Sequence, residues 1–288
     1  MKDAQFIFPP GTKIRLSACD PGATGKLKDK EEAAGRLESG VRELAELQDV
    51  LYAQGTYALL IMFQAMDAAG KDGAIKHVMS GVNPQGCHVV SFKAPSTEEL
   101  GHDYLWRCAK ELPSRGGIGI FNRSYYEEVL VTRVHPELLR RQNIPKHLLD
   151  KDIWKRRYEQ INNFEKYLTG NGFVILKFFL HLSRKEQKKR FLERIEKPEK
   201  NWKFSAADVQ ERAHWSEYMK AYEDAFDHTN TSWAPWHIIP ADKKWFTRLA
   251  VADTIVSLLR SLHLQYPTVP ADHKDLLLKA RGLLEKET

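Results

Sequence analysis

The sequence predicts an α/β protein with a parallel sheet and helices on both of its faces. Short apolar runs alternate along the chain with longer segments in which apolar residues recur every three or four positions, as in strands joined by crossover helices. The first run, Tyr57 to Phe63, is apolar throughout its seven residues, as expected for a central strand covered on both faces. A run of this length is far too short to cross a membrane.

The remaining elements follow in the same alternating order. Strands are expected at 57–63, 88–92, 117–121, 173–180 and 236–239. Helices are expected at 31–54, 70–82, 96–111, 146–169, 206–227, 242–263 and 271–286, with two more after residues 121 and 183. Ser96 and Ser183 each precede a glutamate by three positions, which predicts two capping boxes. The glycines at 170 and 172 end the helix before them.

We expect an N-terminal arm over residues 1–30 and a single domain over residues 31–288. Pro-Pro-Gly at 9–11 and Pro-Gly at 21–22 break regular structure in the arm. The helices within 184–227 are inserted between the last two strands and have room to stand off the sheet as a lid.

The composition excludes several classes of protein. Of the 288 residues, 42% are hydrophobic and 28% are charged, values that exclude a disordered chain or a small disulfide scaffold. The three cysteines lie far apart without a CxxC pair, so neither a disulfide framework nor a zinc cluster is indicated. The first thirty residues contain no continuous apolar core of a signal peptide. A cytoplasmic protein fits these features best.

The stretch from Asp67 to Gly73 has the character of a phosphate-binding loop. It follows a buried strand and precedes a helix, the context that such a loop requires. Gly70 lets the backbone approach phosphate oxygens, the helix N-terminus directs N–H groups at them, and Lys71 can bridge two phosphates. An ordinary turn between a strand and a helix is the alternative. The other expected phosphate-binding residues here are Ala68, Ala69, Asp72, Gly73 and Lys76.

Two departures from the pattern GxxxxGK[ST] concern the metal. Ala65 replaces the first glycine, and Asp72 replaces the serine or threonine whose hydroxyl ligates Mg²⁺. Asp67 is a candidate replacement ligand. Asn122 ends a strand where a Walker B segment presents its metal ligand, although an amide binds metal more weakly than a carboxylate. We therefore expect Mg²⁺, with Mn²⁺ as the alternative ion, at Asp67 and Asn122.

Positive charge is concentrated in residues 184–203. This segment holds nine Lys or Arg and four Glu, a balance of +5, while the whole chain has 44 minus 38, or +6. A polyanionic ligand is one explanation, and a solvated helix face is the other. Spacing places two pairs of cations on shared helix faces. These pairs are Arg184 with Lys188, and Arg190 with Arg194.

These motifs together resemble the polyphosphate kinase 2 family over residues 15–262. The resemblance is carried by Asp67–Gly73, Phe121–Tyr126, Ser183–Arg194, Ala234–Ile239 and Asp242–Lys244. It implies a P-loop kinase fold similar to thymidylate kinase, with a helical lid. It also implies Mg²⁺-assisted transfer of a phosphoryl group between inorganic polyphosphate and a nucleotide, with Asp67, Lys71 and Arg123 as catalytic residues.

The resemblance extends to the remaining ligand residues and to assembly. Arg133 and the four lid cations named above are expected to bind polyphosphate. Asn122, Glu127 and Lys93 are candidates for the nucleotide side. Asn122, followed by Arg-Ser-Tyr-Tyr-Glu-Glu, resembles the subgroup that phosphorylates both AMP and ADP, which makes ATP the final product. A homo-oligomer, either a dimer or a tetramer, is also implied.

Two other functions remain open at this point. An ATP-dependent nucleoside monophosphate kinase would share the fold, the loop and the lid. A nucleic-acid-binding P-loop protein would explain the basic segment, but the sequence has no helicase motif, RNP aromatics or zinc finger. We expect a polyphosphate-dependent kinase that acts by direct in-line transfer, with neither a nucleic acid nor a membrane as its partner.

Overall fold

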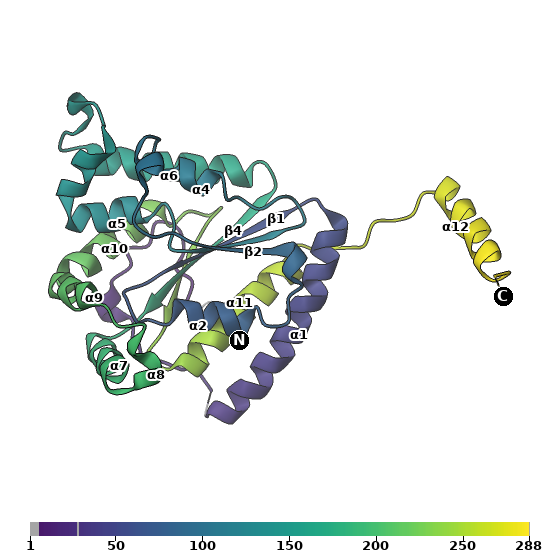
Figure 1. The fold of residues 1–288 in the computed structure, drawn as a ribbon, viewed down its shortest axis with the longest axis horizontal. Coiled ribbons are helices and arrows are strands. Elements are labelled where there is room, and N and C mark those ends of the chain that lie inside the picture. Colours follow the sequence, from purple (N-terminus) through teal and green to yellow (C-terminus); the bar gives the residue numbers. More distant parts are fainter. Residues whose placement is uncertain (1–5, 28, 288) are drawn as a thin grey trace.

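Five parallel strands form one sheet in the order β2-β3-β1-β4-β5 (Figure 1). The computed structural model describes residues 6–27 and 29–287. The strands are β1 (Ala58–Gln64), β2 (Cys87–Ser91), β3 (Ile118–Asn122), β4 (Phe173–His181) and β5 (Trp236–Pro240). Every residue of β1 is buried, because this strand lies in the middle of the sheet. The parallel α/β fold predicted from the sequence is confirmed.

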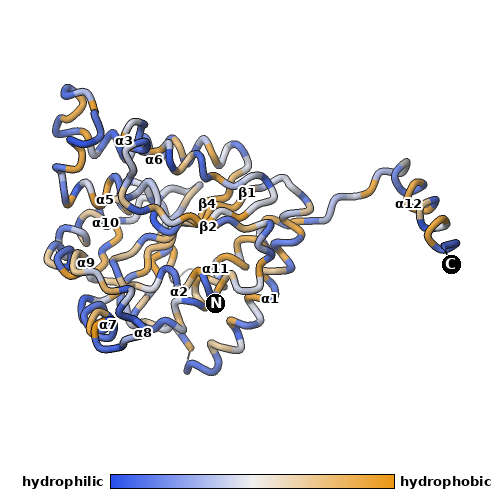
Figure 2. The backbone as a smooth tube through the Cα atoms, viewed as in Figure 1, coloured by the Kyte–Doolittle hydropathy of each residue, from blue (hydrophilic) through white to orange (hydrophobic). Residues whose placement is uncertain are grey.

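Helices cover both faces of the sheet (Figure 1). Their bounds are α1 (Lys30–Gln54), α2 (Lys71–Val78), α3 (Thr97–Leu100), α4 (Trp106–Ala109), α5 (Glu127–Val134), α6 (Ile153–Thr169), α7 (Arg184–Glu196), α8 (Pro198–Asn201), α9 (Ala206–Glu211), α10 (Trp215–Thr229), α11 (Lys244–Ser261) and α12 (Ala271–Leu284). Helices α1, α2 and α11 pack on one face and α5, α6 and α10 on the other, which produces two hydrophobic clusters. Figure 2 shows the apolar residues gathered in the strands between these layers.

Four predicted helices are shorter or divided. The helix expected at 70–82 ends at Val78. The helix expected at 96–111 is two single turns, α3 and α4, since Asp103 accepts a hydrogen bond from Leu105 N and forms a turn between them. The helix expected at 146–169 begins only at Ile153, after a turn closed by Asp150. A 3-10 turn at Arg212–His214 separates α9 from α10. Polar side chains that bond to nearby backbone compete with helix formation in this way.

The two predicted capping boxes have different outcomes. At Ser96, the hydroxyl accepts from Glu99 N and the Glu99 carboxylate accepts from Ser96 N, so the box is complete. At Ser183, the hydroxyl accepts from Glu186 N. The Glu186 carboxylate instead accepts a hydrogen bond from Arg190, one turn further along α7.

The span 184–227, expected as a lid, contains two kinds of helix. Helix α10 buries Tyr218, Tyr222 and Phe226 in one hydrophobic cluster and is therefore part of the body. Helices α7, α8 and α9 lie outside the layers that cover the sheet (Figure 1). They expose several large apolar side chains, among them Leu192 and Ile195. The lid stays a prediction, and α10 packs in the body because its apolar spacing serves the core. We call α7, α8 and α9 the lid segment.

The two ends of the chain behave differently. The described part of the arm, residues 6–27, packs on the body: Ile14 and Leu16 are buried, and Ile7 forms a bridge to His237 of β5. Residues 1–5 and 28 of the predicted arm lie outside the described residues. Helix α12 projects away from the body (Figure 1). It exposes five leucines, which are Leu276, Leu277, Leu278, Leu283 and Leu284.

Within residues 6–27 and 29–287, none of the helices combines the length and the apolar character needed to span a membrane.

Candidate active site

The loop between β1 and α2 has the backbone geometry of a tight turn. Gly70 has φ +103°, in the left-handed region that favours glycine, and Ala68 has φ +62°. Helix α2 then begins at Lys71, with its N-terminus at the carboxyl ends of the parallel strands. In open α/β sheets this edge is where ligands bind, and a helix N-terminus favours anions there.

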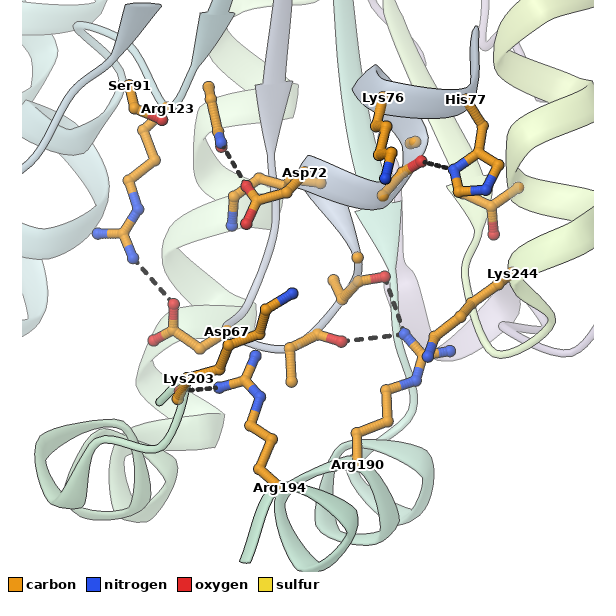
Figure 3. A pocket seen from close by; sticks show the side chains of 18 of the residues that line it. Asp67, Asp72, Lys76, His77, Ser91, Arg123, Arg190, Arg194, Lys203 and Lys244 are labelled. Atoms are coloured by element: carbon orange, nitrogen blue, oxygen red, sulfur yellow. Dashed lines mark hydrogen bonds and ion pairs between the residues drawn. The ribbon is translucent and has the colours of Figure 1, made fainter. Parts of the chain in front are cut away.

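A cavity of about 700 Å³ opens over this loop. Ten cationic side chains and three carboxylates line it, a formal balance of +7. The cations are Lys71, Lys76, Lys93, Arg123, Arg190, Arg194, Lys200, Lys203, Lys244 and Arg248, and the carboxylates are Asp67, Asp72 and Glu193. They come from the loop and α2, from the ends of β2 and β3, from the lid and from α11. Figure 3 shows several of them converging on the space beside Asp67.

Lys71 is held at the floor of this cavity. Its side chain is nearly buried, and its Nζ donates to the carbonyl of Ala65 at 3.2 Å. Burial lowers the pKa of Lys71, and the positive charge of Arg123 lowers it further, while Asp67 opposes both effects. A phosphate bound here would favour the charged lysine, since it brings negative charge to the ammonium group.

Arg123 connects the loop with α5. Its guanidinium donates to Asp67 at 2.8 Å and to Glu127 at 3.4 Å (Figure 3 shows the Asp67 pair). The charge of Glu127 is the main cause that raises the pKa of Arg123. Burial raises the pKa of the Glu127 carboxyl, and Arg123 counteracts this. Arg123 is thus a fixed cation directly beside the loop carboxylate.

The oxygen ligands present are compatible with Mg²⁺. Asp67 and Asn122 line the same cavity, and the Asn122 amide donates to Asp72 at 2.7 Å. The described residues contain no group of three or more His, Cys, Asp or Glu side chains arranged to hold a metal. Mg²⁺ in phosphoryl-transfer sites is usually bound by one or two carboxylates together with substrate phosphates. Asp67 and Asn122, with Asp72 beside them, match that pattern.

Arg190 does not have the role predicted for it. The side chain is 5% exposed, and its guanidinium donates to the carbonyls of Ala68, Ala69, Ala241 and Asp242 at 2.7 to 3.0 Å. Its Nε donates to Glu186 at 3.0 Å. These contacts use all five N–H donors of an arginine, so none remains for a phosphate. Figure 3 shows Arg190 reaching the loop carbonyls. The residue fastens α7 to the phosphate loop.

The other predicted polyphosphate residues divide between cavity and surface. Arg194 lines the cavity and also donates to the Lys203 carbonyl and to Asp208, both at 3.2 Å. Arg184 and Lys188 are exposed and are not among the cavity-lining residues. Arg133 also lies outside, since it pairs with Asp224 and donates to the Tyr158 hydroxyl at 2.9 Å.

Four cavity cations were not singled out from the sequence. They are Lys200, Lys203, Lys244 and Arg248. Lys200 and Lys203 belong to the +5 segment, and Lys244 ends one of the motifs on which the family resemblance depends. Arg248 lies one turn after Lys244 on α11, so helical spacing from Lys244 is the signal that could have found it.

A second cavity, of about 270 Å³, adjoins the first. Both are lined by Lys93, Ala94 and Arg123. The second has four cations and four carboxylates, a formal balance of zero. Apolar and aromatic side chains complete its wall, including Leu100, Tyr104, Tyr125, Val131 and Leu138. Lys93 and Glu127, expected on the nucleotide side, both lie here.

Comparison with known proteins decides the family. The family model described as polyphosphate kinase 2 matches residues 27–267. The chain belongs to the polyphosphate kinase 2 family. The matched residues include the loop, Arg123 and the lid, and they end before α12.

Individual polyphosphate kinase 2 relatives resemble almost the whole chain. An ADP-polyphosphate phosphotransferase of Rhodopseudomonas palustris is 50% identical over 99% of both proteins. An AMP/ADP-polyphosphate phosphotransferase of Meiothermus ruber is 43% identical over 91% of this chain and 95% of that protein. The crystal structure of a polyphosphate kinase 2 from Arthrobacter aurescens superimposes with a TM-score of 0.87 and 39% identity, over 97% of each chain.

Proposed function

We propose that the protein transfers a phosphoryl group from inorganic polyphosphate to AMP and to ADP, reversibly. The observation that carries the proposal is the cavity with a balance of +7 around the phosphate loop. Polyphosphate repeats a negative charge at every phosphate, so it needs a long row of cations, which a nucleotide alone does not. The names of the relatives from R. palustris and M. ruber support the same reaction.

The two cavities divide the substrates between them. Polyphosphate lies in the cationic cavity. The base and ribose of the acceptor lie in the smaller one, where apolar and aromatic side chains lie among charged groups that balance one another. The two substrates meet beside Arg123, which lines both cavities. The transferred phosphoryl group then passes directly between them, without a phosphoenzyme.

Phosphoryl transfer depends mainly on positioning and on charge stabilisation. Lys71 and Arg123 hold the oxygens of the transferred group, and the Asp67–Arg123 pair, at 2.8 Å, fixes the guanidinium before substrate binds. Mg²⁺, held by Asp67 and Asn122, would neutralise charge that develops on the phosphate oxygens. Mn²⁺ is the alternative ion.

The metal proposal predicts the behaviour of an Asp67→Asn variant. An amide at this position removes a negatively charged ligand, so the Mg²⁺ concentration for half-maximal activity should rise about tenfold or more. A Mg²⁺ titration of kcat measures it. Ser91→Ala, at the cavity wall but without a carboxylate, is the control. An unchanged titration in Asp67→Asn would assign the ion to other groups.

One set of assays tests the reaction itself. The protein is incubated with AMP or ADP and Mg²⁺, together with either polyphosphate or ATP as donor, and the nucleotides are separated by chromatography. ADP and ATP should form with polyphosphate. Activity with ATP and AMP alone would instead support a nucleoside monophosphate kinase, and failure with AMP but not ADP would restrict the acceptor.

We further propose that α7 to α9 form the moving part of the lid, that the chain assembles as a homo-oligomer and that it acts in the cytoplasm. The exposed leucines of α12 are suited to contact a second copy. Replacement of Leu276 and Leu283 by Ser should then lower the mass measured by light scattering. Cell fractionation tests the location.

A further inference from the structure

A lysine and a glutamate form a completely buried charged pair beneath the active site. Lys177 of β4 and Glu165 of α6 each have a side-chain exposure of 0%, and their charged atoms are 2.7 Å apart. Burial lowers the pKa of Lys177, and the negative charge of Glu165 opposes that shift. Neither residue lines either of the two cavities described above, and with no exposed side-chain surface neither can contact a substrate directly.

Every polar atom of the pair has a partner. The Lys177 Nζ donates to Glu165 Oε2, to the Tyr126 hydroxyl at 2.9 Å and to the Thr229 carbonyl at 2.8 Å. Glu165 Oε1 accepts from the hydroxyls of Tyr125 and Tyr126, both at 2.9 Å. All three donors of the ammonium group are used. The network joins β4, α6 and the end of α10 to two consecutive tyrosines.

Those tyrosines belong to the turn that carries Arg123. Arg123 has φ +68°, an uncommon backbone conformation for a residue with a side chain. Its N–H donates to the Phe63 carbonyl at 3.0 Å, which holds one side of the turn. Tyr125 and Tyr126 follow Arg123 by two and three residues, and their hydroxyls hold the other side of the turn by donating to Glu165. Strained backbone persists where its surroundings over-determine it.

Stability alone gives little reason for this pair. Replacing a buried ion pair by apolar side chains of similar volume is often neutral or stabilising, whereas such pairs can serve conformational specificity. We infer that Lys177 and Glu165 are positioning residues for phosphoryl transfer, which act through the hydroxyls of Tyr125 and Tyr126 to keep the Arg123 guanidinium aimed at the phosphate loop. The inference rests on the proposed function for its catalytic consequence.

The first variant removes only the link between the pair and the turn. Tyr125→Phe/Tyr126→Phe keeps both rings and the ion pair but deletes the two hydroxyls. We expect kcat to fall about 10- to 100-fold, as for a small misplacement of a catalytic group, while the KM for polyphosphate changes less than about threefold. Tyr218→Phe is the matched control: it deletes another buried hydroxyl that donates to a carboxylate, Glu211, at 2.7 Å, and should retain wild-type kcat.

A double-mutant cycle separates positioning from general damage. In an Arg123→Lys background the two Tyr→Phe changes should cause no further loss of kcat, because the side chain that they position is already absent. If the two Tyr→Phe changes lower kcat by the same factor in the Arg123→Lys background as in the wild type, the inference is wrong. Lys177→Met/Glu165→Leu repeats the test with an apolar pair, and it should show the same lowered kcat. Its melting temperature should also fall, because the buried hydroxyls of Tyr125 and Tyr126 and the Thr229 carbonyl lose their partners.

A measurement without substrate keeps this inference distinct from the proposed function. The Nε–H resonance of Arg123, identified by its absence from Arg123→Lys in ¹⁵N-arginine NMR spectra, should report a restrained side chain in the wild type and a mobile one in both multiple variants. A restrained Arg123 in those variants would overturn the inference. Absence of polyphosphate kinase activity in the wild type would contradict the proposed function. The NMR spectra would still test whether the network restrains the Arg123 side chain.

Discussion

The two cavities that meet at Arg123 are adjacent, but their charges differ strongly. The larger has a formal balance of +7, and the smaller has a balance of zero with apolar and aromatic walls. One is suited to a polyanion whose charge is its only distinctive feature. The other is suited to a ligand with a flat, weakly polar part. Under the proposed function, charge and base would be recognised in separate places and combined only where the phosphoryl group moves.

The largest expected effect follows from removing Lys71, a cation of the larger cavity. Lys71→Ala should lower kcat about 10²- to 10³-fold, the usual scale for loss of one electrostatic stabiliser, and should do so for either nucleotide acceptor. The melting curve should stay close to that of the wild type, because Lys71 is the first residue of α2 at the sheet edge and alanine is a good helix former. Steady-state kinetics and calorimetry check both points, and wild-type turnover would exclude Lys71 from the chemistry.

The second prediction distinguishes the two cavities by changing the larger one, the proposed polyphosphate site. Arg194→Gln/Lys203→Gln removes two cations from the wall of the larger cavity. The KM for polyphosphate should rise several-fold and depend less steeply on salt, since fewer counterions are exchanged on binding, while the KM for the nucleotide should change little. Both constants are measured at several salt concentrations.

The matched control removes the same charge from the same basic segment, residues 184–203. Arg184→Gln/Lys188→Gln changes two exposed cations that do not line the cavity. If it alters the polyphosphate KM as much as the cavity variant does, the effect comes from the overall charge of the lid rather than from the cavity.

The third prediction distinguishes the two cavities by changing the smaller one, the proposed nucleotide site. Leu138 lines the smaller cavity in a 3-10 segment near the surface, where a larger side chain can be accommodated without displacing the sheet. Leu138→Trp should fill part of the 270 Å³ space and raise the nucleotide KM about tenfold, with little change in the polyphosphate KM. Equal rises in both constants would mean that the two cavities do not divide the substrates.

The smallest effect is a change in the pH profile. Burial and Arg123 lower the pKa of Lys71 below the ordinary lysine value of 10.5, so the free enzyme should lose kcat/KM as the pH rises through that lowered value. Bound phosphate favours the ammonium form, and the alkaline limb of kcat should therefore lie at higher pH than that of kcat/KM. Lys71→Arg should remove the limb, because a guanidinium stays protonated. Superimposed limbs in the two profiles would contradict this assignment.

Local signals predicted the sheet and the loop well. The five strands lie within about one or two residues of their expected bounds, because runs that are apolar on both faces indicate buried parallel strands directly. The loop residues Asp67 to Gly73 were found for a similar reason, since a phosphate loop is continuous in sequence. The division of the helix at 96–111 was missed because a side-chain bond to the backbone, from Leu105 N to Asp103, breaks it without interrupting the apolar spacing. The 3-10 turn that divides 206–227 likewise leaves the apolar spacing intact.

What the sequence by itself determined about this protein is the order of strands and helices, the phosphate loop and the family. Only the tertiary structure decided which cations face the substrate. Arg190 and Arg194 are one turn apart and both line the cavity, yet Arg190 has every donor bound by protein atoms, whereas the hydrogen bonds of Arg194 come from its Nη1. The reason is physical. Spacing along a helix shows which residues share a face, but the carbonyls that Arg190 meets come from the loops after β1 and β5, which are distant from α7 in sequence.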